Sequence, residues 1–461
     1  MLQSLPFDIV LAILQFTPAL DILTVRKTCR VLRDASRDRS LWLVVLSCVC
    51  AEHGMLVNAE SDLLVGAPLT RLEHIATSPA RFLALGSNRS ALEHEERIPL
   101  ESPRERSHLR LPVGDHLRSV LLVRGGQFLF TVHDGRICLW DLWTSTGTAA
   151  VVASQPVDIS DAFVVRCEDH WFGDDGRLYV ALAAQGPTPP RGDTTFGVYA
   201  INLLGGTSSF EKINELRLLD GHMWYHTRWG PCIAFSQTHR PLAGVWNYRT
   251  GESALWRPEL IIQGMMLKDD ILTCVHSNAL TVYKVPALES PITVRDIAPC
   301  EARVIRGPSS SSISYHIPHY IAENAHHSVY LGELELMTTF MSSDPPDQSY
   351  AASLPLPNEY NAYAEGTRLG NSLVTLFHTP SRNNARCVVA AVVPPPKTDG
   401  SVESTEGRVC RTLSLLREVS VDMGVQMHLD PTSGTFVYST YQEPNVVHIV
   451  RYLKAPDGVV H

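Results

Sequence analysis

The sequence has no hydrophobic run long enough to cross a membrane, because none approaches the roughly 18 residues that a spanning helix requires. A basic leader is also missing, and Pro6 and Asp8 interrupt the apolar stretch that a signal peptide would need. The formal net charge is −9, so the chain lacks the excess of positive charge with which proteins neutralise nucleic-acid phosphates. We therefore expect neither a membrane nor a nucleic acid as partner.

A cysteine pattern typical of disulfides or of a zinc site is absent as well. The ten cysteines are scattered, and the one close pair, Cys48 and Cys50, has no second pair that would complete a zinc site. Since no secretory route is indicated, we expect reduced thiols and a cytoplasmic or nuclear location.

Catalytic motifs are missing too. The sequence contains no Gly-rich phosphate loop, no Gly-x-Ser-x-Gly elbow and no His-Glu-x-x-His pair. His316 and His319 lie close together, but Pro318 excludes a helical metal pair and no carboxylate or cysteine lies at ligand spacing. We predict no catalytic residue, no metal and no cofactor. An enzyme that gathers acidic residues from distant parts of the chain remains an alternative.

Apolar residues are concentrated in the first 42 positions. Leu5-Pro6 opens a helical run and Leu41-Trp42 closes the segment, which at about 40 residues is too short to supply a core for itself. The apolar positions of the first helix surround most of its circumference; they are Leu5, Ile9, Val10, Leu11, Ile13 and Leu14. Such a helix must be covered from two sides. We expect one side to pack in its own bundle and the other to bind another protein.

This segment resembles the F-box, the helical module that docks a recognition subunit onto the Skp-type adaptor of SCF ubiquitin ligases. The matching positions are Leu5-Pro6, Asp8, Ile9, Ile13-Leu14, Asp21-Ile22-Leu23, Val25, Cys29-Arg30 and Leu41-Trp42. Two departures are mild: Leu32 stands where Trp is common, and Pro18-Ala19 occupies the first interhelical loop. The resemblance implies an adaptor-binding set of Leu5, Pro6, Ile9, Ile13, Leu14, Leu23, Val25, Leu41 and Trp42. Which of them contact the adaptor and which fill the bundle stays open.

Three regions are indicated by the pattern: an F-box at 1–46, a helical and charged linker at 47–110, and a strand-rich domain at 111–455. Pro68 can open a helix that Pro79 bends or divides. The Leu-Glu-His-Ile-Ala-Thr segment of this helix is similar to the region after the F-box in many fungal F-box proteins. We expect it to hold the recognition domain at a fixed angle to the adaptor.

After Leu117 the apolar pattern changes to the two-residue period of strands. The first unit consists of three predicted strands and the turns between them. They are a first strand, a Gly125-Gly126 turn, a strand at 127–132, an Asp134-Gly135 hairpin and a strand at 136–142. The unit ends in Trp140-Asp141, which resembles the ending of WD-type propeller blades.

The unit recurs along the chain. Its third strand is matched at Trp140, Tyr199, Trp246, Tyr283, Tyr330, Val389 and Ile449. Seven units predict a multidomain α+β protein with a small all-α F-box bundle and an all-β propeller of seven blades; six or eight remain possible. The last unit stops at its third strand, so we predict that residues near Leu109–Val113 supply the missing outer strand and close the ring.

An aromatic and basic patch at 222–229 lies where an innermost strand is expected. Trp, Tyr and Arg are enriched in binding hot spots. The predicted target-binding set is His222, Trp224, His226, Arg228 and Trp229, with Trp171 one blade earlier and Arg303 and Arg306 for an acidic or phosphorylated target. The alternatives are that the tryptophans pack between blades and that the arginines are simply solvated.

The resemblance implies a non-catalytic substrate receptor of an SCF-type ubiquitin ligase. The F-box would bind the adaptor and, through it, a cullin, while the propeller would capture a protein target. The alternatives are an F-box scaffold that acts outside a ligase and a propeller enzyme with a fortuitous helical leader.

Overall fold

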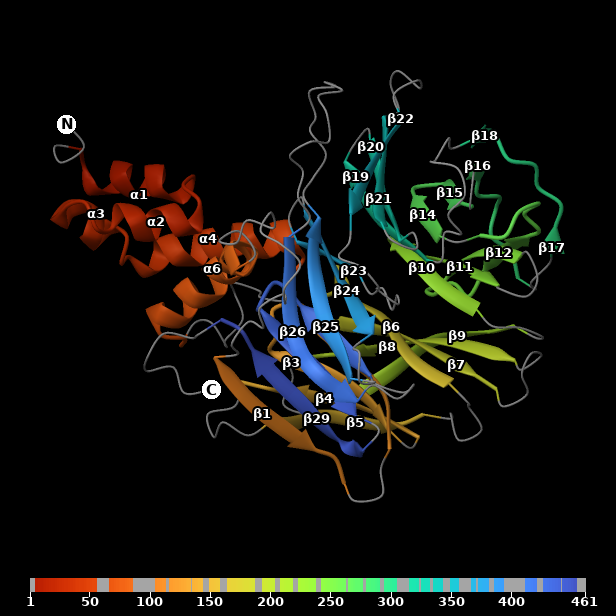
Figure 1. Ribbon diagram of the computed structural model, residues 1–461, viewed down its shortest axis with the longest axis horizontal. Coiled ribbons are helices and arrows are strands. Elements are labelled where there is room, and N and C mark those ends of the chain that lie inside the picture. The colour runs from red at the N-terminus through yellow and green to blue at the C-terminus, as the bar shows by residue number, and fades with distance from the viewer. Residues whose placement is uncertain are drawn as a thin grey trace.

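A small helical part at the N-terminus is followed by a large ring of sheets in the computed structural model (Figure 1). Within the described part of the chain, no helix is both long enough and apolar enough to span a bilayer. The structure describes residues 5–55, 66–85, 104–112, 116–133, 135–143, 149–157, 164–186, 193–203, 208–218, 223–237, 242–262, 264–276, 279–290, 294–304, 315–322, 325–331, 335–342, 349–355, 366–369, 372–380, 385–393, 411–420, 426–440 and 442–453.

The helices have local start and stop signals. Their bounds are α1 Phe7–Gln15, α2 Ala19–Val25, α3 Arg30–Ala35, α4 Arg39–His53 and α6 Leu69–Leu85. Pro6 and Pro18 precede α1 and α2, where a missing N–H costs nothing. The Asp38 carboxylate caps α4 by accepting a hydrogen bond of 2.8 Å from the Ser40 N–H. Gly54 ends α4 with φ +60°, a conformation that favours glycine.

All of these helices share one core, which extends past the predicted F-box boundary at residue 46. Helix α4 crosses that boundary, and α6 packs in the same core. The fully buried members include Ile22, Leu41, Trp42, Leu46 and Leu72. The start of the predicted linker is therefore an integral part of the helical domain, because Leu72, Ile75 and Ala76 of α6 supply core that the first 46 residues lack.

In the part of the chain that the structure describes, seven sheets follow the helices and form a propeller (Figure 1). The first three comprise β2 Leu117–Leu122, β3 Phe128–His133, β4 Arg136–Asp141 and β5 Ala150–Pro156; β6 Val164–Phe172, β7 Leu178–Gln185, β8 Thr194–Ile201 and β9 Phe210–Leu218; and β10 Met223–Trp229, β11 Cys232–Gln237, β12 Leu242–Asn247, β13 Ser253–Trp256 and β17 Val294–Arg295. The next two comprise β14 Gly264–Lys268, β15 Ile271–Val275, β16 Ala279–Lys284 and β18 Glu301–Val304; and β19 Tyr315–Ala322, β20 Ala325–Leu331, β21 Glu335–Ser342 and β22 Ser349–Pro355. The last two comprise β23 Gly366–Leu369, β24 Ser372–Pro380, β25 Ala385–Val393 and β26 Arg411–Ser420; and β27 Met427–Asp430, β28 Thr435–Thr440, β29 Glu443–Arg451 and β1 Glu105–Arg110.

Among the described strands, neighbours within a sheet are antiparallel, with one exception. Strand β17 leaves the fourth unit and pairs parallel to β13 of the third, with Leu255 opposite Val294. The predicted β3–β4 hairpin is confirmed, with His133 opposite Arg136. The prediction for Tyr330 is wrong, because Tyr330 lies in β20, the second strand of its sheet. The innermost strand of this sheet, β19, starts only at Tyr315, so its third strand is β21.

The ring is closed by an N-terminal strand, as the sequence predicts. Strand β1 pairs antiparallel with β29 and completes the last sheet, with Leu109 opposite Val447. The strand runs over 105–110 rather than 109–113, so the propeller begins at Glu105 and not at residue 111. Completing the blade in this way covers an edge of β29 that would otherwise be open to other chains.

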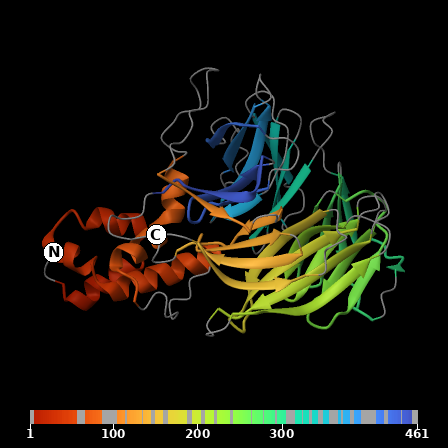
Figure 2. The ribbon, with the colours of Figure 1, turned by 90° about the horizontal axis from the view of Figure 1, so that it is seen from below.

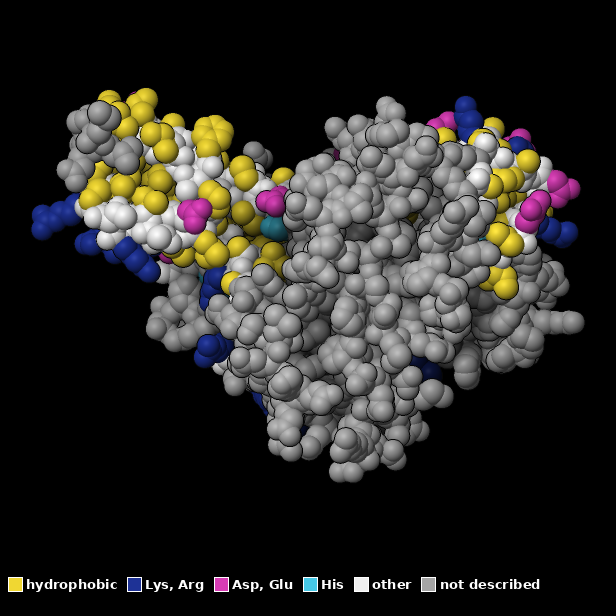
Figure 3. Space-filling model, turned by 45° about the horizontal axis from the view of Figure 1, so that its top comes forward, with side chains coloured by type: hydrophobic (Ala, Val, Ile, Leu, Met, Phe, Trp, Pro, Cys, Tyr) yellow, Lys and Arg dark blue, Asp and Glu magenta, His cyan; other side chains and the backbone are white. Residues whose placement is uncertain are grey.

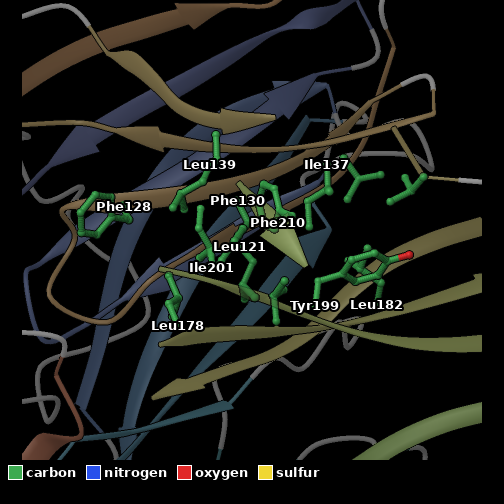
Figure 4. Close-up of a cluster of buried hydrophobic side chains, with 14 of the residues drawn as sticks. Leu121, Phe128, Phe130, Ile137, Leu139, Leu178, Leu182, Tyr199, Ile201 and Phe210 are labelled. Atoms are coloured by element: carbon green, nitrogen blue, oxygen red, sulfur yellow. The ribbon is translucent and has the colours of Figure 1, made fainter. Parts of the chain in front are cut away.

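Apolar side chains fill the space between successive blades. Figure 4 shows the cluster between the first two blades, in which Phe130, Ile137, Leu139 and Leu178 have no exposed surface. The Trp140 indole N–H donates a hydrogen bond of 2.9 Å to the Thr131 hydroxyl. Because this core is built between sheets rather than within one sheet, each blade depends on its neighbours for burial.

Helix α6 connects the helical core to the propeller core. Its first half packs among the helices, whereas Phe82 packs with Phe436 and Leu453 of the last blade. Figure 2 shows the helical part at one side of the ring, with α6 beside the C-terminal strands. Two further contacts join the parts: Arg124 Nη1 donates to the His53 carbonyl at 3.2 Å, and the Arg71 guanidinium lies 4.6 Å from the Trp143 ring centroid.

Candidate protein-binding surfaces

The first helix presents an apolar face that the protein's own core leaves uncovered. Ile9 and Ile13 are 44% and 46% exposed, and Phe16, directly after the helix, is 91% exposed. These residues are spaced i, i+4, i+7, which places them on one side of the helix. Val10 and Leu14 lie one position further along the sequence and are buried in the bundle. The apolar residues of α1 therefore form two stripes, one for the core and one facing outward.

A groove of about 420 Å³ lies beside the exposed stripe. It is lined by Val10, Ile13, Leu14, Thr17, Val25, Thr28 and Leu32. The hydroxyls of Thr17 and Thr28 donate to the carbonyls of Ile13 and Val25, so both threonines can present methyl groups to the groove. Figure 3 shows hydrophobic side chains gathered over this part of the molecule. Together, stripe and groove can bind an apolar segment of another protein.

The structure divides the predicted adaptor-binding set. Pro6, Ile9 and Ile13 are exposed, whereas Leu5, Leu23 and Val25 are half-buried at the edge of the core. Leu41 and Trp42 have no exposed surface, and Leu14 is almost completely buried although it lines the groove. Their apolar character serves the bundle. Sequence reasoning missed Phe7 and Phe16, although the spacing of Phe16 from Ile9 and Ile13 carries the signal.

A hydrogen-bond network beside Trp42 joins α2, α4 and α6. The Trp42 indole N–H donates to the Ser36 carbonyl at 2.7 Å, and the Arg26 guanidinium lies 5.9 Å from the centroid of the ring. Arg26 also donates to the Ser36 carbonyl at 2.6 Å and to both carboxylate oxygens of Glu73, at 2.6 and 3.2 Å. Since Glu73 belongs to α6, this network fixes the F-box helices to the helix that reaches the propeller.

Trp171, predicted to bind a target, instead fills the space between two blades. It is 6% exposed, stacks on Tyr179 at 5.6 Å and donates its indole N–H to the Tyr248 hydroxyl at 3.2 Å. The Arg228 guanidinium lies 4.5 Å from the ring centroid and donates to the Gly230 carbonyl. The ring of Trp171 is therefore covered by the neighbouring blade.

Trp229 has the exposure that a binding residue needs. It ends β10, is 42% exposed and donates its indole N–H to Asp269 of the next blade at 3.2 Å. Phe172 ends β6, the innermost strand of the preceding blade, and is 36% exposed. His222 and Arg306 lie outside the described residues. Trp224, His226 and Arg303 lie in β10 and β18, and their side chains fall outside the description.

Buried polar side chains join the first, second and last blades. His428 accepts a hydrogen bond from the Leu122 N–H through Nδ1, and His170 accepts one from the Arg124 N–H through Nε2. Burial lowers the pKa of each histidine to about 3, and the positive charge of Arg124 adds to the effect. Both rings are thus neutral acceptors that hold β2 and its turn. Within the residues that the structure describes, no cluster of three potential metal ligands occurs.

These features define a class of protein: a β-propeller that carries a helical docking module with an uncovered apolar face. The family model for the F-box domain matches residues 2–44, which include the exposed stripe and all the residues that line the groove. The chain therefore carries an F-box domain, followed by a β-propeller. F-box domains bind Skp-type adaptors.

Solved structures with similar folds are distant in sequence. The WD40 domain of SCAP from fission yeast has a TM-score of 0.41 and 6% identity, covering 73% of this chain and 82% of that chain. Hsv2 from Kluyveromyces marxianus has a TM-score of 0.38 and 9% identity, covering 73% and 97%. A Saccharomyces cerevisiae structure of Dbp5 with Nup159 and Gle1 has a TM-score of 0.37 and 8% identity, covering 77% and 98%. No curated protein matches the chain.

Proposed function

We propose that this protein is the substrate-recognition subunit of an SCF-type ubiquitin ligase. The observation that carries the proposal is the stripe of Ile9, Ile13 and Phe16, which stays exposed although the helical core is complete without it. Covering these side chains with the Skp-type adaptor removes apolar surface from water and links the chain to a cullin. The propeller then holds a protein target near the ubiquitin-charged enzyme, and the contribution to rate is proximity alone.

The connection between the two parts supports this role. A receptor must hold its target in a defined place relative to the adaptor, and α6 belongs to both hydrophobic cores. The Arg26–Glu73 ion pair, at 2.6 Å, fastens the same helix to α2. A continuous helix with buried contacts at both ends transmits orientation better than a flexible linker would.

For the target we propose the face of the propeller at which β6 and β10 end. Trp229 and Phe172 are large, exposed and placed at equivalent ends of adjacent innermost strands. Tryptophan is among the residues most enriched at hot spots, and its neighbour Arg228 is already positioned by its stack on Trp171. A protein segment with an apolar anchor fits such a surface.

Purification of the full-length chain with a tag, followed by identification of the bound proteins, tests the proposal. Deleting residues 1–45 would expose the face of α6 that packs on them, so the double substitution Ile9→Asp/Ile13→Asp is the cleaner variant. We expect adaptor and cullin with the wild type and neither with the variant. Val151→Asp, at an exposed apolar position on β5, is the matched control and should retain both.

The other outcomes separate the alternatives. Recovery of the adaptor without a cullin would favour an F-box scaffold outside a ligase. Failure of the wild type to bind any Skp-type adaptor would contradict the proposed function.

A further inference from the structure

A group of cations lies next to the groove of the helical part. Lys27, Arg30, Arg33 and Arg37 are all exposed, and between positions 27 and 37 the only acid is Asp34. Among the described residues, none of the four cations takes part in an ion pair or in a side-chain hydrogen bond. This concentration is unusual in a chain whose formal net charge is −9. We call these four residues the basic rim.

The basic rim is continuous with the surface that faces the adaptor in the proposed function. Arg30, Arg33 and Arg37 are spaced i, i+3, i+7 and therefore lie on one side of α3 and of the turn after it. Thr28 and Leu32, which alternate with them in the sequence, line the apolar groove. Figure 3 shows Lys and Arg side chains along the border of the helical part, beside the hydrophobic ones.

The local energetics of α3 disfavour a cation at its first position. Arg30 is the first residue of the helix, where the helix dipole favours an acid, and the first turn contains no acidic residue. Cys29 precedes the helix and makes no side-chain capping hydrogen bond. Like charges at i, i+3 and i, i+4 repel each other. Arg33 lies in the last turn, where the dipole favours a cation, but the fold gains nothing from a cation at position 30, so a role outside the fold explains Arg30 better.

We propose that the basic rim binds an acidic surface of the Skp-type adaptor and steers its approach to the apolar groove; this inference rests on the proposed function. The rim contributes long-range attraction, which raises the association rate, and the apolar stripe then determines how slowly the complex dissociates. Polar side chains around an apolar centre are the usual arrangement of protein interfaces.

The double substitution Arg30→Glu/Arg33→Glu in the full-length chain tests the rim. The probe is a purified Skp-type adaptor, and the measurement is the association and dissociation rate from about 20 mM to about 500 mM salt. We expect the association rate at low salt to fall by about tenfold or more, its salt dependence to flatten, and the dissociation rate to change by less than about threefold. The thermal midpoint should change little, because glutamate is favoured at position 30 in the first turn of α3 and disfavoured at position 33 in the last turn.

Arg249→Glu/Arg257→Glu is the matched control, since it changes the net charge by the same amount at exposed positions of the propeller. Its association rate should stay within about threefold of the wild type. If the rim variant associates like the wild type at every salt concentration, the inference is overturned. It is also overturned if the variant loses binding only to a DNA duplex or an anionic vesicle. A wild type that binds no adaptor would instead refute the proposed function, so the two failures are distinguishable.

Discussion

At the scale of single residues, the apolar side chains of α1 have two different tasks. Val10 and Leu14 are buried with Trp42 in the helical core, whereas Ile13 and Phe16 are exposed on the adjacent side. Substitutions in the two groups should therefore separate stability from binding.

Phe16→Ala is expected to weaken adaptor binding by about 1–3 kcal/mol without changing the thermal midpoint, because its side chain is 91% exposed in the free protein.

Trp42→Ala should lower the free energy of unfolding by about 3–5 kcal/mol, because it empties a fully buried site. Calorimetric titration with the adaptor and chemical unfolding measure the two effects. Equal losses of stability in both variants would contradict the division.

Glu73→Ala is expected to destabilise the protein by about 2–4 kcal/mol. The substitution leaves Arg26 largely buried, with 18% of its side chain exposed, and without its ionic partner. Urea unfolding of the variant measures the loss. Arg217→Ala, which removes a more exposed ion pair with Asp193, is the control and should cost less than about 1 kcal/mol.

The buried histidines make stability depend on pH. His428 keeps a pKa of about 3 in the fold, because burial and the charge of Arg124 disfavour its protonated form, whereas an unfolded histidine titrates near 6.5. The contribution of His428 to the stability of the fold is therefore complete above about pH 6.5 and is lost as the pH falls toward 3.

Glu168 makes stability depend on pH in the opposite direction. Burial raises the pKa of its carboxyl to about 7, so its contribution is present below about pH 4.5 and is lost as the pH rises toward 7.

His428→Asn removes the titration and leaves an acceptor for the Leu122 N–H. Between about pH 6 and 5 the variant should lose less stability on acidification than the wild type, by up to about 1.4 kcal/mol per pH unit. Urea unfolding at several pH values provides the comparison. Parallel pH profiles for the two proteins would show that His428 is not the titrating group.

Residue identity alone did not decide which aromatic side chains bind partners. Trp171 and Trp229 belong to similar aromatic patches, yet one is covered by Tyr179 and Tyr248 and the other is 42% exposed. Tryptophan suits cores and interfaces equally well, so only the neighbouring blade settles its role. Phe16 was predictable in principle, because it continues the i, i+4, i+7 stripe of Ile9 and Ile13.

At the scale of elements, α6 determines how the two parts are joined. Its N-terminal half carries Leu72 and Ile75 into the helical core, and Phe82 follows Pro79 into the core of the last blade. A proline inside a helix removes one backbone hydrogen bond and bends the axis. Pro79 thus lies between the half of α6 that packs among the helices and Phe82, which packs on the last blade.

Phe82→Ala is expected to destabilise the protein by about 3–5 kcal/mol and to loosen the propeller from the helices, because Phe82 is fully buried between them. Hydrogen exchange of α6 and β28 should accelerate together. Thr70→Ala, at an exposed position of the same helix, is the control and should leave both elements unchanged. Faster exchange confined to α6 would argue against the bridging role.

Elements with strong local signals were predictable, and elements defined by distant contacts were not. The hairpin of β3 and β4 follows from Asp134-Gly135 between alternating apolar runs. Strand β1 was expected four residues too late, because its sequence is polar and only Leu109 is buried. The parallel pairing of β17 with β13 joins two units and has no local signature.

At the scale of the whole molecule, an uncovered apolar surface at one end is joined to a ring that can hold another protein. Both halves of this arrangement are present in the chain: the F-box at 2–44 and the sheets that β1 closes. The central claim is that the adaptor covers α1 and the groove beside it while the propeller stays free for a target.

Amide hydrogen exchange of the full-length protein, with and without a saturating Skp-type adaptor, tests this claim most directly. We predict slower exchange in residues 7–25 and unchanged exchange in the first four blades, 117–304. Tight binding that leaves 7–25 unprotected, or that protects the propeller instead, would contradict the claim.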